Sequence, residues 1–194
     1  MEDVKTLSAG STHTLVLTLQ NKVLQLGLDQ QRLWEIEKYS ITSLVAGSYL
    51  SAAITSEQTL LIWDNLTPHE VTQMNDIAQV KLSTNPDHPF VAAIDTHGRL
   101  FLWGSNSFGQ LGTDDLENRD KPTCVQRLAR KSITQVALGS GFVIALGQTS
   151  TKLRDKLSLT THRSGGSTRS KSPLTHSTKP TLLTQRTQNV QSPR

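Results

Sequence analysis

The sequence contains an acidic cluster with the residue types of a paired-carboxylate site. Asp114, Asp115, Glu117 and Asp120 lie close together, with Arg119 among them. Two carboxylates held side by side can divide general acid and general base work. Adjacent acids in a polar loop, however, are more often solvated than catalytic. We therefore expect no catalytic residue here and no enzymatic activity.

The other candidate ligand groups lack the spacing that their chemistry needs. Gly139-Ser140-Gly141 resembles part of a phosphate-binding loop, but a strand pattern follows it and the Gly-Lys-Ser/Thr of such loops is missing. The six histidines show no metal-ligand spacing with one another or with Cys124. The sequence therefore predicts no metal and no cofactor.

The single cysteine and the first residues bear on the compartment. Cys124 alone cannot form an internal disulfide, which favours a reducing environment. The stretch Met1-Glu2-Asp3-Val4 lacks the basic segment and apolar core of a signal peptide. No apolar run approaches the roughly 18 residues that a membrane span needs. We expect a cytoplasmic or nuclear protein without membrane insertion.

Charge and composition divide the chain into two parts. Residues 1–150 contain 11 Lys or Arg against 15 Asp or Glu, whereas residues 151–194 contain nine Lys or Arg against Asp155 alone. The second part has 16 Ser or Thr in 44 residues and no aromatic residue, so it cannot bury enough apolar surface to fold. We predict a folded domain over 1–150 and a disordered basic tail over 151–194, where only the leucine-rich stretch 152–161 favours residual strand or helix.

The tail has the features of an electrostatic arm. Its net charge of +8 predicts a weak, salt-sensitive contact with a polyanion. Ser172 and Ser192 each precede a proline among basic residues, and both are candidate phosphorylation sites whose modification would cancel part of that charge. The alternative is that such Ser-Pro pairs arise by chance in a Ser-rich tail.

A repeat organises residues 4–150. Four segments, 4–10, 41–47, 77–83 and 133–139, share a β-branched residue six positions before a final small residue and a Leu or Val three positions before it. A second apolar strand follows each segment, at 13–17, 50–54, 90–94 and 142–146, and three units continue into a third strand at 22–27, 59–64 and 99–104. Each unit is predicted to be an antiparallel meander. One copy cannot cover its own apolar face, so the copies must stack as propeller blades do.

The third unit carries a pattern that resembles the repeat of the regulator of chromosome condensation family. Its Trp-Gly-x-Asn-x-x-Gly-Gln-Leu-Gly signature is complete, and the stretch 9–17 is similar to the small-residue, Gly, His and apolar-strand part of the same repeat. We interpret the signature residues as structural, because the glycines permit sharp turns and the tryptophan packs between blades. These residues are Gly98, Trp103, Gly104, Asn106, Gly109, Gln110, Leu111 and Gly112, and Trp63 stands at the position equivalent to Trp103.

The resemblance implies a closed propeller of about seven blades. This chain has repeats for about half of that number, and the second unit has Trp63-Asp64 without the glycine-rich loop. We predict an all-β fold, a partial (open) β-propeller of about three and a half four-stranded blades followed by the disordered basic tail. Strand edges left exposed at the open ends favour self-association.

The function favoured by these patterns is a noncatalytic protein-interaction module, because every patterned residue serves the fold. Its partner would be a protein that binds the blade loops. The resemblance implies a second function, guanine-nucleotide exchange on a small GTPase, which needs a surface that prefers the nucleotide-free GTPase and no catalytic side chain. No motif in the chain matches exchange residues of the family, so exchange is the alternative and a small GTPase is the candidate partner.

Overall fold

The structure is a computed structural model that describes residues 3–27, 31–34, 38–64, 67–149 and 181–184. Ser172, Ser192 and the stretch 152–161 lie outside the described residues. The described part of the chain is almost entirely β-structure, and its single helical element is a 3-10 turn, η1, at Gln126–Leu128. No helix in that part is long and apolar enough to cross a membrane.

The strands form four antiparallel sheets, which we call blades 1 to 4 in chain order. Blade 1 contains β1 (Val4–Ala9), β2 (His13–Thr18), β3 (Val23–Gly27) and β4 (Gln31–Trp34). Blade 2 contains β5 (Ile41–Ala46), β6 (Ser51–Thr55), β7 (Leu60–Trp63) and β8 (His69–Glu70). Blade 3 contains β9 (Ile77–Leu82), β10 (Phe90–Asp95), β11 (Leu100–Gly104) and β12 (Arg119–Cys124), and blade 4 contains β13 (Lys131–Leu138), β14 (Val143–Thr149) and β15 (Thr181–Thr184).

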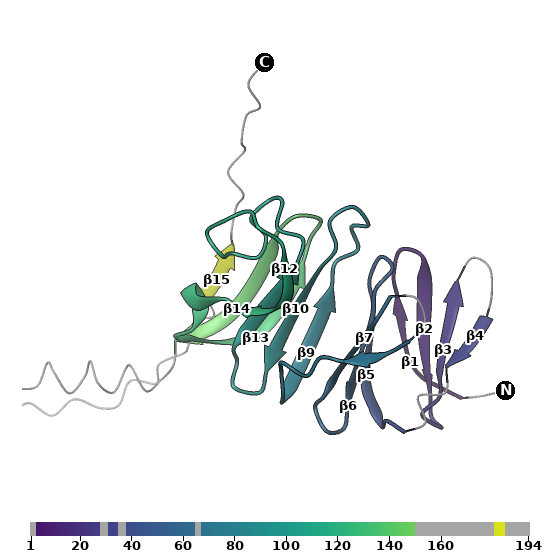
Figure 1. The fold of residues 1–194 in the computed structure, drawn as a ribbon. Helices are drawn as coiled ribbons and strands as arrows, with labels where there is room; N and C mark the ends of the chain where they lie inside the picture. The colour runs from purple at the N-terminus through teal and green to yellow at the C-terminus, as the bar shows by residue number, and fades with distance from the viewer. Residues whose placement is uncertain (1–2, 28–30, 35–37, 65–66, 150–180, 185–194) are drawn as a thin grey trace, which may run out of the picture.

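The blades stack face to face in an open arc (Figure 1). Three clusters of buried apolar side chains fill the spaces between consecutive blades. Leu15 and Leu17 of blade 1, for example, lie in one cluster with Leu44 and Trp63 of blade 2. We call the face of a blade toward the preceding blade its leading face, and the face toward the next blade its trailing face. The open partial propeller predicted from the sequence is confirmed.

Burial explains the sequences of the first and second strands. In β9, Ile77 and Val80 are buried between blades, whereas Ala78 and Lys81 are exposed. The second strand lies in the middle of the sheet, so blades cover both of its faces and every residue of β10 is buried. A continuous apolar run such as Phe90–Ile94 is therefore the pattern of a strand covered on both faces.

The first strands of consecutive blades lie next to one another, and small residues let their ends approach. A Cβ added at Gly10 would lie 2.0 Å from the Gly47 carbonyl oxygen, which no side chain could accommodate. Backbone hydrogen bonds continue this contact, because Ser11 N–H donates to the Gly47 oxygen (3.0 Å) and Ser48 N–H donates to the Ser83 oxygen (3.1 Å). The glycines that end the first two repeat segments, Gly10 and Gly47, are thus required by close contact between blades.

The fourth strands were not located from the sequence, although four-stranded blades were predicted. They are the outermost strands, and β8 consists of two exposed polar residues. In β12, Pro122 lacks a backbone donor, which an edge strand tolerates. With little apolar surface to bury, these strands leave no periodic pattern in the sequence.

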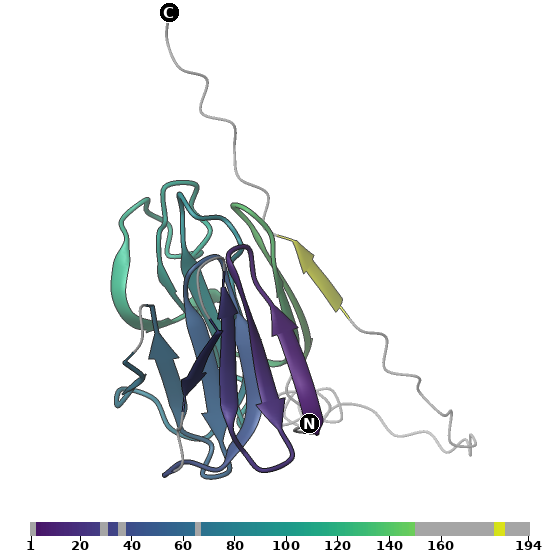
Figure 2. The same cartoon turned by 90° about the vertical axis from the view of Figure 1, so that its right-hand side faces the viewer.

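The structure differs from the sequence-based prediction in the tail. Residues Thr181–Thr184, inside the segment predicted to be disordered, form β15 and pair antiparallel with β14. The register aligns Leu183 with Ala145, so β15 takes the third position of blade 4, which β3, β7 and β11 fill in the other blades. Figure 2 shows β15 along the edge of the last sheet. The physical reason is that β14 would otherwise present unpaired amide and carbonyl groups.

Candidate functional site

The complete repeat signature continues from β11 into a long loop, residues 105–118, that leads to β12. Gly104, Gly109 and Gly112 adopt positive φ angles of 106°, 72° and 65°, and Gly98 in the preceding hairpin has a φ of 77°. L side chains rarely adopt this region. At Gly104 space is limiting as well, because an added Cβ would lie 2.6 Å from the Pro89 carbonyl oxygen.

Asn106 is the centre of this loop. Its side chain is fully buried, and Oδ1 accepts a hydrogen bond from Leu111 N–H (2.9 Å). Nδ2 donates to the Asp115 carbonyl oxygen (2.9 Å) and to Thr113 Oγ1 (3.2 Å). Its backbone N–H donates to Asn118 Oδ1 (2.8 Å). Because one amide side chain both donates and accepts, Asn106 ties the two arms of the loop together.

Asp115 has a structural role that its sequence context does not indicate. Its Oδ1 accepts hydrogen bonds from Thr113 Oγ1 (3.0 Å) and Glu117 N–H (3.0 Å), and Oδ2 accepts one from Arg119 Nη2 (2.6 Å). Desolvation raises the pKa of Asp115, but hydrogen bonds from Arg119, Glu117 and Thr113 outweigh it and hold the pKa below its ordinary value. Asp115 is therefore an anchor of the loop and not the merely solvated acid that was expected. The neighbouring Asp114 accepts a hydrogen bond from Arg127 Nε (2.9 Å) at the surface.

The remaining signature side chains also point into the protein. Leu111 is buried in the cluster between blades 3 and 4, and Trp103 is buried between blades 2 and 3. Gln110 is buried, and its Oε1 accepts a hydrogen bond from Phe108 N–H (2.9 Å), while its Nε2 has no partner among the described residues. These contacts hold the backbone on both sides of Phe108.

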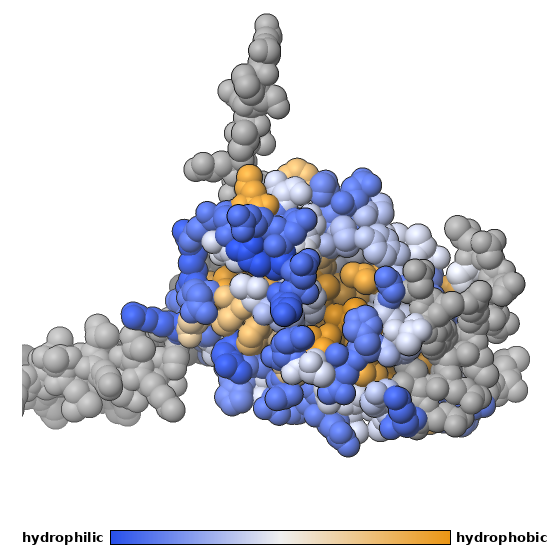
Figure 3. All heavy atoms as spheres, viewed as in Figure 1, coloured by the Kyte–Doolittle hydropathy of each residue, from blue (hydrophilic) through white to orange (hydrophobic). Residues whose placement is uncertain are grey.

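What the loop leaves exposed is apolar. The Phe108, Leu116 and Phe142 side chains are 46%, 60% and 46% exposed. Phe108 packs edge-on against His88, with ring centroids 4.7 Å apart, and a Cβ added at Gly141 would lie 3.0 Å from the Phe108 ring. The loop of blade 3 therefore touches the β13–β14 turn of blade 4. We call His88, Phe108, Leu116 and Phe142 the loop patch. In Figure 3, a few apolar residues stand among hydrophilic ones along the upper edge of the molecule.

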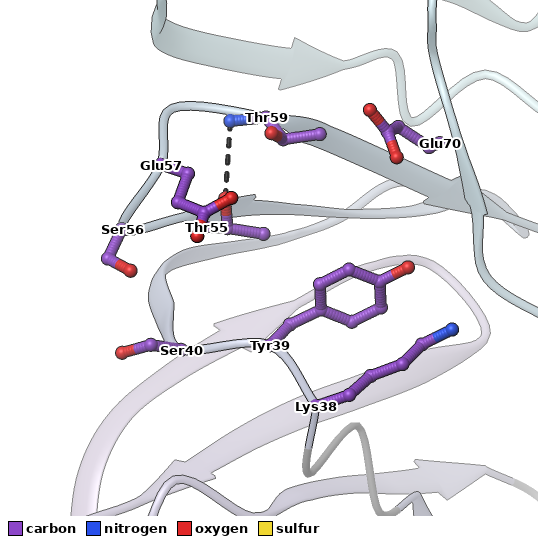
Figure 4. Close-up of a pocket in the computed structure, with 8 residues that line it drawn as sticks. All are labelled: Lys38, Tyr39, Ser40, Thr55, Ser56, Glu57, Thr59 and Glu70. Carbon is purple, nitrogen blue, oxygen red and sulfur yellow. Dashed lines mark hydrogen bonds between the residues drawn. The ribbon is translucent and has the colours of Figure 1, made fainter.

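A hollow lies between the segment that leads into β5 and the β6–β7 turn of blade 2, at the end of the blades opposite to the loop patch (Figure 4). It has a volume of about 180 Å³ and is lined by Lys38, Tyr39, Ser40, Thr55, Ser56, Glu57, Thr59 and Glu70. Lys38 Nζ lies 4.8 Å from the centroid of the Tyr39 ring, and Thr59 N–H donates to Thr55 Oγ1 (3.2 Å). Its mixture of one ammonium, two carboxylates and hydroxyls does not match one ligand class.

The histidine, cysteine and glycine-rich turn considered as candidate ligand groups are packed within the fold. His13 is buried, its Nε2 lies 2.8 Å from Ser51 Oγ, and burial lowers the pKa of its ring. Burial raises the pKa of the Cys124 thiol, which keeps it protonated at neutral pH. Gly139-Ser140-Gly141 is the β13–β14 turn, and the Phe142 ring folds back over Gly139. In the described ranges, no group of three His, Cys, Asp or Glu side chains could hold a metal ion.

Comparison with known sequences bears on the repeat. Residues 97–146 match the sequence model described as the regulator of chromosome condensation (RCC1) repeat. The chain is 24% identical over 172 residues to the ultraviolet-B receptor UVR8 of Arabidopsis thaliana, which covers 74% of this chain and 39% of the receptor. It is 27% identical over 167 residues to the human E3 ubiquitin-protein ligase HERC2, covering 71% of this chain and 4% of the ligase. The chain thus spans well under half the length of these relatives.

Solved structures share the fold. Prp20p from Saccharomyces cerevisiae, described with its binding properties to Gsp1p and histones, matches with a TM-score of 0.67 at 17% identity. The match covers 80% of this chain and 47% of that chain. At this identity the likeness concerns the fold alone. The family resemblance inferred from the third unit is confirmed.

Proposed function

We propose that this chain, which carries the regulator of chromosome condensation repeat, is a noncatalytic protein-interaction module that binds a protein partner through the loop patch. One observation carries the proposal. In the complete repeat Trp103, Asn106, Gln110 and Leu111 are all buried, and the loop that they fix presents Phe108 and Leu116 to solvent.

The energetics of association favour such a surface. Exposed aromatic and aliphatic side chains gain free energy when a partner removes them from water. A loop already held by internal hydrogen bonds loses little conformational entropy on binding, so more of that gain remains as affinity. Phe108 is held by the Phe108–Gln110 hydrogen bond and by its contact with His88, and it is therefore the expected anchor.

The test is affinity capture from the cell of origin with the full chain and a Phe108→Ser/Leu116→Ser variant, followed by titration with the purified captured protein. We expect the variant to weaken binding at least about tenfold, because hot-spot aromatics typically contribute that much. Leu19→Ser is the matched control, since Leu19 is 63% exposed in the β2–β3 turn at the opposite end of the blades. Equal binding by all three proteins, with unchanged thermal melts, would contradict the proposal.

Guanine-nucleotide exchange is the second candidate. The likeness to Prp20p, which is described with its binding to Gsp1p, favours it. The direct measurement is release of a fluorescent guanine nucleotide from purified Gsp1p in the presence of the full chain. The interaction-module proposal expects no acceleration, whereas acceleration by substoichiometric amounts of the chain would favour exchange.

The basic tail adds a second, electrostatic contact in this proposal. Residues 151–194 have nine Lys or Arg against one acid, which suits a polyanion. A contact of this kind weakens as salt rises, so its salt dependence separates it from binding at the loop patch.

A further inference from the structure

Blades 2, 3 and 4 bury the same positions of their leading faces. Ile41, Ile77 and Ile133, six residues before the small residue of each repeat, are 1%, 1% and 2% exposed. Leu44, Val80 and Val136, three residues before it, are 7%, 2% and 5% exposed. Each of these positions packs against the trailing face of the preceding blade. The leading face is thus the constant half of the contact between blades.

Blade 1 has the same leading face without a cover. At the two equivalent positions Val4 and Leu7 are 54% and 63% exposed. Leu26 takes the position that Trp63 and Trp103 occupy in blades 2 and 3, and it is 38% exposed. Apolar residues stand at all three of these positions and are exposed in this structure, whereas Val16, which pairs with Leu7 on the same face, is 5% exposed in the middle of the sheet. A face of this composition is typical of a surface that another protein element covers.

Blade 4 has the matching trailing face. The positions of Leu15 and Leu17 in blade 1 correspond to Ile144 and Leu146 in blade 4, both only half-buried. Ala137 pairs with Ile144 across the sheet and is exposed on the same face. The chain therefore carries both halves of one more contact between blades, at opposite ends of the arc.

We propose that two copies of the chain associate head to tail, with the trailing face of blade 4 in each copy packed on the leading face of blade 1 in the other. Two such contacts are related by a two-fold axis and close a ring. The length of the chain is consistent with such a ring. The chain spans 46% and 47% of two solved chains of this fold, so two copies together match about the full length of one solved chain. Self-association thus uses sheet faces, whereas the sequence-based prediction placed it at strand edges.

The contact at the inner ends of the strands is defined by the repeat as well. Ser11 N–H donates to the Gly47 oxygen between blades 1 and 2, and Ser48 N–H donates to the Ser83 oxygen between blades 2 and 3. Ser140 is the equivalent residue of blade 4. In the ring its N–H donates to the carbonyl oxygen of Gly10 in the second copy, which fixes the register of the two faces.

The first test is the mass of the full chain in solution, measured by sedimentation velocity over a range of concentrations. We expect a monomer–dimer equilibrium, and Leu7→Glu should raise the dissociation constant at least about tenfold because it buries a charge in an apolar contact. Leu19→Glu is the matched control, since Leu19 is exposed to the same 63% but lies in the β2–β3 turn, off both faces. Thermal melts show whether each variant is folded.

A mixing experiment distinguishes this contact from other dimers. Leu7→Glu damages only the leading face and Ala137→Glu only the trailing face, and both residues are exposed in the single copy. Each variant alone should be monomeric, whereas an equal mixture should form a heterodimer through the one intact contact. A symmetric contact of blade 1 with blade 1 would give no such rescue. A wild-type chain that stays monomeric at all concentrations, one that forms open polymers, or a mixture without rescue would each overturn the proposal.

Discussion

At the scale of single residues, the Asn106 side chain holds the loop of blade 3 together by hydrogen bonds. Its amide joins Leu111, Thr113 and Asp115, which come from both arms of the loop. Asn106→Ala would leave the buried Leu111 N–H without its acceptor and would remove the hydrogen bonds to Thr113 and Asp115, and we expect a loss of about 2–4 kcal/mol in the free energy of unfolding. Urea denaturation measures it. Asn85→Ala is the control. Half-buried Asn85 donates to the Ser140 oxygen and accepts from Asp87 N–H, both at the surface, so its loss should cost less than about 1 kcal/mol.

Two substitutions in the same loop compare the effect of backbone strain on stability with the effect of removing a charge. Gly109 has a φ of 72°, and its added Cβ would meet only Leu116 at 3.7 Å, so Gly109→Val costs strain of about 1–3 kcal/mol without a clash. Asp114 has a φ of 66°, which Asn tolerates, and its ion pair with Arg127 is 61% exposed on each side. We therefore expect Asp114→Asn to melt within a degree or so of wild type. Similar losses for the two variants would show that the turn is not the cause.

Buried His13 makes stability depend on pH. Burial lowers its pKa from 6.5 in the folded chain, so the unfolded chain binds more protons just below that pH. Stability is therefore highest with His13 neutral and falls as pH drops through 6.5 toward the folded pKa. Thermal melts of His13→Gln at about pH 7.5 and about pH 5.5 should show a smaller difference than wild type. His69→Gln, at an exposed strand position, should keep the wild-type difference.

At the scale of the element, apolar burial decides what can be predicted. The first three strands of blades 1 to 3 were predictable from their apolar spacing, because the strands that lie between blades bury at least one face and β10 buries both. β1 has the same spacing, although its apolar residues are exposed. The fourth strands bury too little to leave a pattern, and in β15 a Thr-Leu-Leu-Thr stretch forms a strand only because β14 offers a free edge. In the loop the glycines and Trp103 were predictable from type and spacing. The anchoring by Asp115 and the exposure of Phe108 depend on contacts across the loop, which no spacing encodes.

The pairing of β15 with β14 has a direct test. Truncation after residue 150 removes β15 and leaves one edge of β14 unpaired, so we expect a lower melting temperature and faster amide exchange in β14. Truncation after residue 184 keeps β15 and is the control. An unchanged melt for the shorter chain would mean that the pairing contributes nothing to stability.

At the scale of the whole molecule, opposite charges on body and tail make the tail a controllable contact. Phosphorylation of Ser172 and Ser192 would add about −1.5 to −2 charges each against the tail's +8. We expect the 151–194 peptide to bind double-stranded DNA less tightly when both serines are phosphorylated, and less tightly as salt rises. Titration of both peptides at two salt concentrations measures this. If the affinity of the peptide for DNA does not change with phosphorylation or with salt concentration, the tail is not an electrostatic arm.

The residues between blades also set the curvature of the arc. At the ends of the first strands, Gly10 and Gly47 bring consecutive blades to backbone contact, whereas Trp63 and Trp103 hold the third strands apart. Each space between blades is thus a wedge, thin at the glycine and thick at the tryptophan. If every pair of neighbouring blades is inclined by the same angle, that angle determines how many blades complete a circle. Leu26 stands at the tryptophan position of blade 1 and is a smaller side chain. In the proposed dimer, the angle between blade 4 of one copy and blade 1 of the other would therefore be smaller than the angles between blades within one chain.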